Sequence, residues 1–348
     1  MKYIQTVCGA VSPNQIGFTL PHEHIFWDLN IYLPKDLDRN DKSDARNQNI
    51  TLENLSEVRS HFQKYSQNVV QHDLDVAIKE LIWYKQAGGS AICDCTVRGI
   101  NPNPSKIKIA SDRSGVHILL GTGYYCHNSL TDSENRLDKD KKAEQILHDL
   151  RKGFDDTDIK AGFIKIGVES IDSESDKQSL AAAAIAQKET GAAILIHQPG
   201  IEHQADGIFK ALTDNGGDLN RVVMCHCDPL LPDHDYIDHI AKCGAYISFD
   251  FFGLESRLSP TFWLPTDRDR VFAIMQQIDR GNLNKLLMSH DTVYKTMLRS
   301  YGGYGYAHLP HDMVPVFLAH GYTQKWINQM TIENPRKIFS LSTDKFNA

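Results

Sequence analysis

The sequence lacks the long apolar runs and the strong charge excess that define several classes of protein. No stretch of the 348 residues is long and apolar enough to span a membrane, and residues 1–17 lack the apolar core of a signal peptide. We therefore expect a cytoplasmic protein with reduced thiols and no membrane partner. The net charge of -7 argues against nucleic acid as a partner.

Two further absences concern short motifs. The seven cysteines lack the C-x-x-C spacing that is usual for zinc sites. The pairs Cys93/Cys95 and Cys225/Cys227 lie in or beside apolar runs, so we interpret them as small buried residues that line a barrel, with zinc binding as the alternative. No G-x-G-x-x-G follows the first apolar run, which argues against an open dinucleotide-binding sheet.

Short apolar runs, typical of buried parallel strands, recur along the whole chain. They lie near residues 16–20, 90–95, 116–121, 162–167, 192–197, 221–226, 244–249 and 285–290. Helix-like segments alternate with them, among them residues 75–87, 179–190, 267–280 and 323–330. Eight β/α repeats predict an α/β fold of the (β/α)8 TIM barrel type, as a single domain over residues 1–348 with long βα loops.

Three long connections follow strand candidates. Residues 31–49 are polar and charged, and we expect an exposed loop there, with a lid over the site as the alternative. Residues 253–268 include Phe262 and Trp263, which favours a pocket wall. Residues 291–310 are rich in glycine and tyrosine, which is typical of a flexible aromatic loop after the last strand.

Side chains that can bind metal lie at the ends of several strand candidates. His22 and His24 end the first, and residues two apart in a strand face the same side. Lys165 lies inside an apolar strand, where an unpaired ammonium is costly to bury. The fifth, sixth and eighth strands lead to His197, His226 and Asp291. A lone histidine at a strand end is more often structural, but the carboxyl ends of barrel strands share one mouth, so we expect one metal site.

The order of these residues resembles that of the phosphotriesterase-like branch of the amidohydrolase superfamily. The matching stretches are Gly17–His24, the strand with Lys165, His197, His226, Leu286–Asp291, Arg299–Leu309 and Glu333–Phe339. The resemblance runs essentially from end to end, and it implies a TIM barrel with a binuclear metal centre.

The resemblance also implies a role for each ligand. Asp291 and the two histidines of the first strand would bind the more buried metal, and the histidines of the fifth and sixth strands the more exposed one. Lys165, carboxylated to N6-carboxylysine, would bridge both metals, because a carbamate offers two anionic oxygens where an ammonium would repel two cations. An unmodified lysine beside a single metal is the alternative. Zinc suits these ligands, as do Mn2+, Co2+ and Fe2+.

A centre of this kind predicts a metal-dependent hydrolase acting on a small-molecule substrate. A metal-bridging hydroxide would attack a carbonyl or phosphoryl centre, and Asp291 would take its proton. Lactone hydrolysis is the first hypothesis, with an anionic or phosphorylated sugar lactone as the substrate. Organophosphate triester hydrolysis and amide or carbamate hydrolysis are alternatives at the same centre. A metal-binding scaffold without catalysis is the alternative from another class.

Four residues are candidates for substrate binding. Tyr125 follows the third strand, where the branch places an aromatic residue in the pocket. Phe251 stands where members that hydrolyse acyl-homoserine lactones carry an arginine, which weakens an assignment to that subset. Lys295 and Arg299 follow Asp291 and could meet an anionic group of the substrate.

Structural roles are expected for two residues that flank the ligands, Glu23 and His290, because each points away from its neighbouring ligands in a strand. The branch is commonly dimeric, so a homodimer is compatible with the sequence. Aromatic residues such as Trp27, Trp263 and Trp326 could lie at its interface or in a pocket wall.

Overall fold

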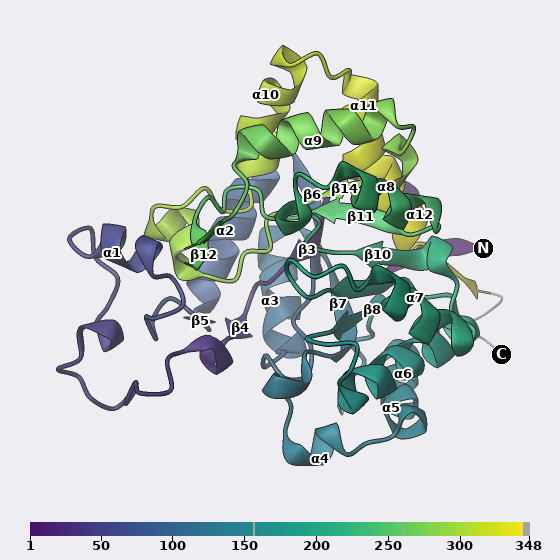
Figure 1. The fold of residues 1–348 in the computed structure, drawn as a ribbon, viewed down its shortest axis with the longest axis horizontal. Helices are drawn as coiled ribbons and strands as arrows, with labels where there is room; N and C mark the ends of the chain where they lie inside the picture. The colour runs from purple at the N-terminus through teal and green to yellow at the C-terminus, as the bar shows by residue number, and fades with distance from the viewer. Residues whose placement is uncertain (156, 260, 344–348) are drawn as a thin grey trace.

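A barrel of eight parallel strands, surrounded by helices, forms the centre of the molecule (Figure 1). The computed structural model describes residues 1–155, 157–259 and 261–343. The barrel strands are β3 (Phe18–Glu23), β6 (Gly89–Asp94), β7 (His117–Tyr124), β8 (Phe163–Gly167), β9 (Ile194–His197), β10 (Val222–Met224), β11 (Tyr246–Phe249) and β14 (Leu286–Met288). Each predicted strand coincides with one of them, so the predicted barrel is confirmed.

The strands pair in chain order, β3–β6–β7–β8–β9–β10–β11–β14, and every pair is parallel. The first and last strands approach each other through two polar contacts. The backbone N–H of His22 donates to the hydroxyl of Ser289 at 3.1 Å, and that of Asp291 donates to the carbonyl of His22 at 3.2 Å. These contacts bring the first and last predicted ligands to one place.

Glu23 also links the first and last strands of the barrel. Its carboxylate accepts hydrogen bonds from the hydroxyl of Ser289 at 2.8 Å and from the backbone N–H of Thr292 at 3.0 Å. It also lies 2.7 Å from Nδ1 of His290 and accepts from the backbone N–H of that residue at 2.8 Å. Burial alone would raise the pKa of Glu23, but His290 and Ser289 lower it. Glu23 and His290 thus hold the barrel together, as expected.

Helices follow the strands and cover the outside of the barrel. They include α2 (Leu74–Gln86), α3 (Pro104–Ser114), α5 (Lys139–Arg151), α6 (Glu174–Thr190), α7 (Ala205–Asp214), α8 (His234–Lys242), α9 (Asp267–Asp279), α10 (Val314–Ala319), α11 (Gln324–Asn328) and α12 (Asn334–Phe339). Capping residues explain where α6 begins and ends. The hydroxyl of Ser173 accepts a hydrogen bond from the N–H of Asp176 at its start, and Gly191 ends the helix at a φ of 70°. All four named helix predictions coincide with helices.

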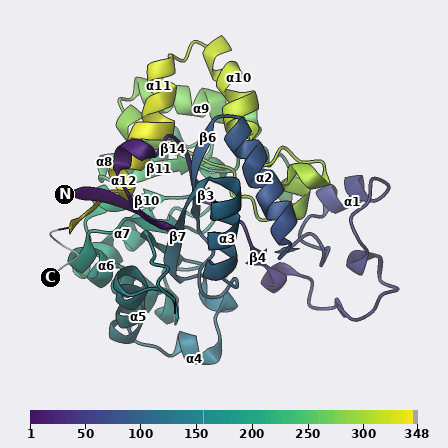
Figure 2. The ribbon, with the colours of Figure 1, turned by 180° about the vertical axis from the view of Figure 1, so that it is seen from behind.

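Short antiparallel strands near the two ends of the chain were not predicted. β1 (Lys2–Thr6) pairs with β2 (Gly9–Val11) and with β15 (Leu341–Ser342). In both views the N-terminal strand lies close to α12, the helix that precedes β15 (Figures 1 and 2). These strands are two to five residues long, and strands this short leave little periodicity in the sequence.

The barrel interior holds three of the four cysteines that were interpreted as small lining residues. Cys93, Cys95 and Cys225 belong to a fully buried cluster inside the barrel, together with aliphatic side chains such as Leu119. Cys227 is also buried, but it packs with the larger cluster under the helices. All seven thiols are free.

The polar loop at residues 31–49 is mostly exposed, as expected, and extends away from the barrel beside α1 (Leu55–Ser60) (Figure 1). A small ribbon of β4 (Trp27–Asp28) and β5 (Val70–Gln71) lies at its base. Trp27 is fully buried there, so it cannot lie at a dimer interface. In the described part of the chain, no helix is both long and apolar enough to cross a membrane.

Candidate metal centre

The barrel mouth brings the first group of predicted ligands together. Nε2 of His22 lies 2.9 Å from Nζ of Lys165 and 3.3 Å from Oδ1 of Asp291. Nε2 of His24 lies 3.2 Å from the same oxygen. All four side chains are buried. Donor atoms of His22, His24 and Asp291 lie within 4.8 Å of one another, a spacing that can surround one ion.

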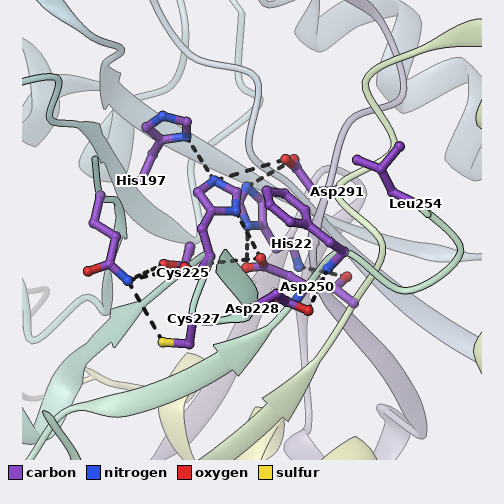
Figure 3. Close-up of polar contacts among 12 residues, drawn as sticks. His22, His197, Cys225, Cys227, Asp228, Asp250, Leu254 and Asp291 are labelled. Carbon is purple, nitrogen blue, oxygen red and sulfur yellow. Dashed lines mark hydrogen bonds and ion pairs between the residues drawn. The ribbon is translucent and has the colours of Figure 1, made fainter. Parts of the chain in front are cut away.

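A second group lies beside the first. Nε2 of His226 lies 2.8 Å from Nδ1 of His197 and 3.9 Å from Oδ2 of Asp291. The rings of His22 and His226 are 4.9 Å apart. Figure 3 shows His22, His197 and Asp291 close together at the barrel mouth. The two oxygens of Asp291 thus face different groups of imidazoles.

Two of these residues have unusual backbone conformations. His226 has a φ of 58° and Asp291 a φ of 49°, which place both in the left-handed region. Non-glycine residues there cost about 1–3 kcal/mol each and cluster at functional sites. His226 lies two residues beyond the end of β10 and Asp291 three residues beyond the end of β14, so each side chain leaves a turn at the barrel mouth.

The polar atoms of the centre fit a divalent cation. Oδ1 of Asp291 is shielded from solvent and accepts no hydrogen bond from a described residue. A buried, unpaired carboxylate oxygen is costly, and a cation between it and the imidazoles would remove that cost. Burial alone would raise the pKa of Asp291, but His22 and His24 hold it well below its usual value. The carboxylate is therefore ionised, as a ligand must be.

Two histidines of the centre, His22 and His197, are in the protonation state that metal binding needs. Burial, with the charge of Lys165 nearby, lowers the pKa of His22 to about 4. Burial and the neighbouring His226 lower the pKa of His197 well below its usual value. Both imidazoles are therefore neutral at physiological pH and can offer a lone pair.

Asp250, which was not among the predicted site residues, supports both groups. Its Oδ2 lies 2.8 Å from Nδ1 of His22, and its Oδ1 lies 2.9 Å from Nδ1 of His226. A carboxylate behind a histidine fixes the tautomer and orientation of a ligand. The residue follows directly after strand β11, the position that identified the ligands on other strands, so the same pattern could have found it.

A buried ion pair positions Asp250 in turn. Oδ2 of Asp228 accepts the backbone N–H of Asp250 at 2.8 Å, and Oδ1 lies 2.5 Å from Nε of Arg270. Both side chains of the pair are inaccessible to solvent. Behind His24, the hydroxyl of Thr96 lies 2.8 Å from its Nδ1. Polar partners therefore hold both Asp250 and His24 in position.

A cavity of about 170 Å³ opens beside the centre, with largely apolar walls. Tyr125 lines it, and its hydroxyl lies 3.0 Å from that of Tyr32 and 3.4 Å from Nδ1 of His197. Phe251 also lines it and stacks on His226 at a ring separation of 4.7 Å. The two aromatic substrate-binding candidates are therefore at the cavity. Tyr32, at the start of the long polar loop, was not among the predicted site residues.

Lys295 and Arg299 lie elsewhere, which corrects their expected position. Nζ of Lys295 lies 5.7 Å from the centre of the Tyr301 ring, and the guanidinium of Arg299 lies 4.9 Å from that of Trp83. Short 3-10 turns after Asp291 carry both side chains away from the cavity. Among the lining residues that the structure describes, there is no lysine or arginine.

The wall expected from residues 253–268 forms in part. Leu254 and Leu264 line the cavity. The side chain of Trp263 instead lies on the surface, 67% exposed, in the ribbon of β12 (Arg257–Ser259) and β13 (Phe262–Trp263). The segment thus contributes aliphatic side chains to the wall, not the tryptophan.

The chain is similar to known proteins over its whole length. The sequence profile of the phosphotriesterase family matches residues 2–339. A phosphotriesterase-related protein of Nematostella vectensis is 33% identical, over 95% of this chain and 97% of that protein. An N-acetyltaurine hydrolase of Dictyostelium discoideum is 33% identical, over 97% and 98% of the two chains. The structure of a resiniferatoxin-binding protein from Rhodobacter sphaeroides has a TM-score of 0.90 at 32% identity, over 97% of this chain and 94% of that one.

Proposed function

The chain belongs to the phosphotriesterase family of binuclear metal hydrolases, and we propose that it hydrolyses a carboxylic acyl bond at a centre built from six residues. These residues are His22, His24, Lys165, His197, His226 and Asp291. The observation that carries the proposal is the buried oxygen Oδ1 of Asp291, which accepts no hydrogen bond from a described residue and faces Nε2 of His22 at 3.3 Å and Nε2 of His24 at 3.2 Å. Two divalent ions, when bound, supply an activated water and polarise the acyl oxygen of the substrate.

Each ion has its own donors in this proposal. Nε2 of His22 and of His24, with Asp291, would hold one ion, and Nδ1 of His197 with Nε2 of His226 would hold the other. Lys165 lies at 2.9 Å from Nε2 of His22, where an ammonium would repel a cation. N6-carboxylation would give this side chain two anionic oxygens that can join both ions. Zinc suits the donors best, and Mn2+, Co2+ or Fe2+ suit them as well.

Side chains around the centre would guide the reaction. Asp291 is ionised and can accept a proton at its carboxylate and pass it to the leaving group. Tyr125 can orient the substrate through its hydroxyl, which lies beside Nδ1 of His197. Phe251 and Leu254 exclude water from the cavity, which strengthens polar interactions within it.

We propose a small neutral N-acyl amide as the substrate class. The relative named N-acetyltaurine hydrolase supports an amide, because N-acetyltaurine is a carboxylic amide. The described cavity walls support a neutral compound, because no lysine or arginine lines them to pair with a sulfonate, phosphate or carboxylate. The same walls argue against the phosphorylated sugar lactone first expected. A neutral lactone is the second candidate, since its carbonyl and apolar ring suit the same cavity.

A matched panel of substrates tests this proposal. Zinc-loaded protein is offered N-acetyl amides of equal size with neutral or sulfonate ends, a neutral lactone and a neutral phosphotriester. We expect the highest kcat/KM for the neutral amide. A higher kcat/KM for the sulfonate would contradict the proposal that the substrate is neutral. Faster lactone turnover would favour the second candidate.

Two variants test the centre itself. Asp291→Asn should lower kcat by about 100-fold or more, the scale expected for a lost general base. Asp140→Asn, on the exposed first turn of α5, should leave kcat unchanged. Wild-type turnover by Asp291→Asn would contradict the proposed site for every substrate in the panel.

A further inference from the structure

We propose that Asp206, His239 and Cys243 form a separate zinc site on the outside of the barrel. Asp206 lies in the first turn of α7, and His239 and Cys243 lie at the end of α8. Donor atoms of the three side chains lie within 4.8 Å of one another. None of the three lines the cavity beside the catalytic centre. The site therefore stands independently of the proposed hydrolase reaction.

Helix geometry presents the donors in the same direction. His239 and Cys243 are four residues apart, so they lie on one face of α8. Nε2 of His239 lies 2.7 Å from Oδ1 of Asp206 on the neighbouring helix, and 3.7 Å from Sγ of Cys243. His239 is thus the central donor of the three, and an ion held here would join α7 to α8.

The distances suit zinc after a small adjustment. With zinc bonds of about 2.3 Å to sulfur and about 2.0 Å to nitrogen, a tetrahedral site places these two donors about 3.5 Å apart. The observed separation of Cys243 and His239 is 3.7 Å. The carboxylate of Asp206 would have to move back by about 0.6 Å to reach a tetrahedral spacing. Its side chain is 78% exposed and free to do so, and solvent can supply a fourth ligand.

The chemistry of the donors favours an ion over a simple ion pair. Aspartate and histidine alone form a common surface contact, but the thiol adds a soft donor that strongly prefers zinc among the common divalent ions. Cys8, an exposed cysteine, provides a contrast to the half-buried Cys243. Its sulfur contacts Asp112 at 3.1 Å and Ser111 at 3.5 Å. Because neither contact brings a histidine to that thiol, we expect no zinc site at Cys8.

Thiol labelling under native conditions tests the site. The other five cysteines are buried, so a Cys8→Ser protein should expose only Cys243 to Ellman's reagent. With zinc at about ten times its dissociation constant, labelling should slow about tenfold. The variants His239→Ala and Asp206→Asn should lose most of this protection. His203→Ala removes a nearby exposed histidine outside the cluster and should keep it.

A cobalt spectrum provides a second readout. Cobalt added to the Cys8→Ser protein should give a thiolate-to-cobalt absorption band, and the Cys243→Ser change should remove that band. Zinc protection that survives His239→Ala, or no protection in the Cys8→Ser protein, would overturn the proposal. The three side chains lie at the surface, and circular dichroism confirms that each variant is folded before labelling.

Discussion

Nδ1 of His22 lies 2.8 Å from Oδ2 of Asp250, and this contact turns the opposite ring nitrogen toward the centre of the barrel mouth. The second oxygen of Asp250 does the same for His226, at 2.9 Å. One carboxylate therefore orients a histidine in each of the two proposed groups of ligands. Burial alone would raise the pKa of Asp250, but His226 and His22 hold it well below its usual value, so the carboxylate stays ionised.

Replacing Asp250 by asparagine should weaken metal binding. An amide keeps the shape of the carboxylate, but its nitrogen cannot accept a hydrogen bond from one of the two rings. We expect a 10- to 100-fold loss of zinc affinity, the range typical for such outer partners, measured by competition with a chelator. Asp140→Asn should bind zinc like the wild type. Equal affinities of the two variants would show that Asp250 does not orient the ligands.

Removing the cation that pairs with Asp228 should destabilise the fold. Arg270→Met leaves a buried, uncompensated carboxylate behind Asp250, and breaking a buried pair on one side costs about 3–5 kcal/mol. Urea unfolding measures this loss. The double variant Arg270→Met/Asp228→Asn should recover part of it, because the unpaired charge is gone. A single variant as stable as the wild type would contradict the role of the pair.

The hydroxyl of Tyr125 should contribute to catalysis without supporting the fold. Tyr125→Phe removes the contacts to Tyr32 and His197, which are 3.0 and 3.4 Å long. We expect kcat/KM to fall about 10-fold, corresponding to one lost hydrogen bond of about 1.4 kcal/mol, with an unchanged melting temperature. Tyr32→Phe serves as the matched control for the tyrosine pair. An unchanged kcat/KM in Tyr125→Phe would assign that residue to wall packing alone.

His308 should make stability depend on pH. Burial alone would lower its pKa, but contacts with Asp267 at 2.8 Å and Asp312 at 2.9 Å raise it. Because the folded pKa lies above the unfolded value, this stabilisation is complete below about pH 6.5 and is lost as the pH rises through the folded pKa. We expect the free energy of unfolding of the wild type to exceed that of His308→Gln by about 1–3 kcal/mol at about pH 6, and this difference should shrink at higher pH. A difference in the free energy of unfolding that stays constant with pH would show that protonation of His308 does not stabilise the fold.

The sequence identified the barrel because its strands are continuous apolar runs separated by helices. The parallel arrangement buries both faces of each strand, so the runs are easy to recognise. The same topology explains why His22 and Asp291 could be placed together, although they lie at opposite ends of the chain. The short strands β1, β2 and β15 were missed because they are too brief to carry a periodic pattern.

Loop geometry limited what the sequence could say about the cavity. Tyr125 and Phe251 lie one and two residues beyond the ends of β7 and β11, and the structure places both at the cavity as expected. Lys295 and Arg299 lie several residues beyond a strand, where 3-10 turns redirect them to other aromatic rings. Tyr32 comes from a connection whose path no local pattern predicts. Proximity to a strand end therefore determined which substrate-binding candidates reached the cavity.

Anomalous diffraction from crystals of the zinc-loaded protein tests the binuclear centre most directly. We expect two zinc peaks at the barrel mouth. One should lie among His22, His24 and Asp291, and the other should lie beside His197 and His226. Electron density for a carbamate should extend beyond Nζ of Lys165 toward both peaks. A single peak at the mouth, or none, with a bare lysine amine, would contradict the binuclear centre.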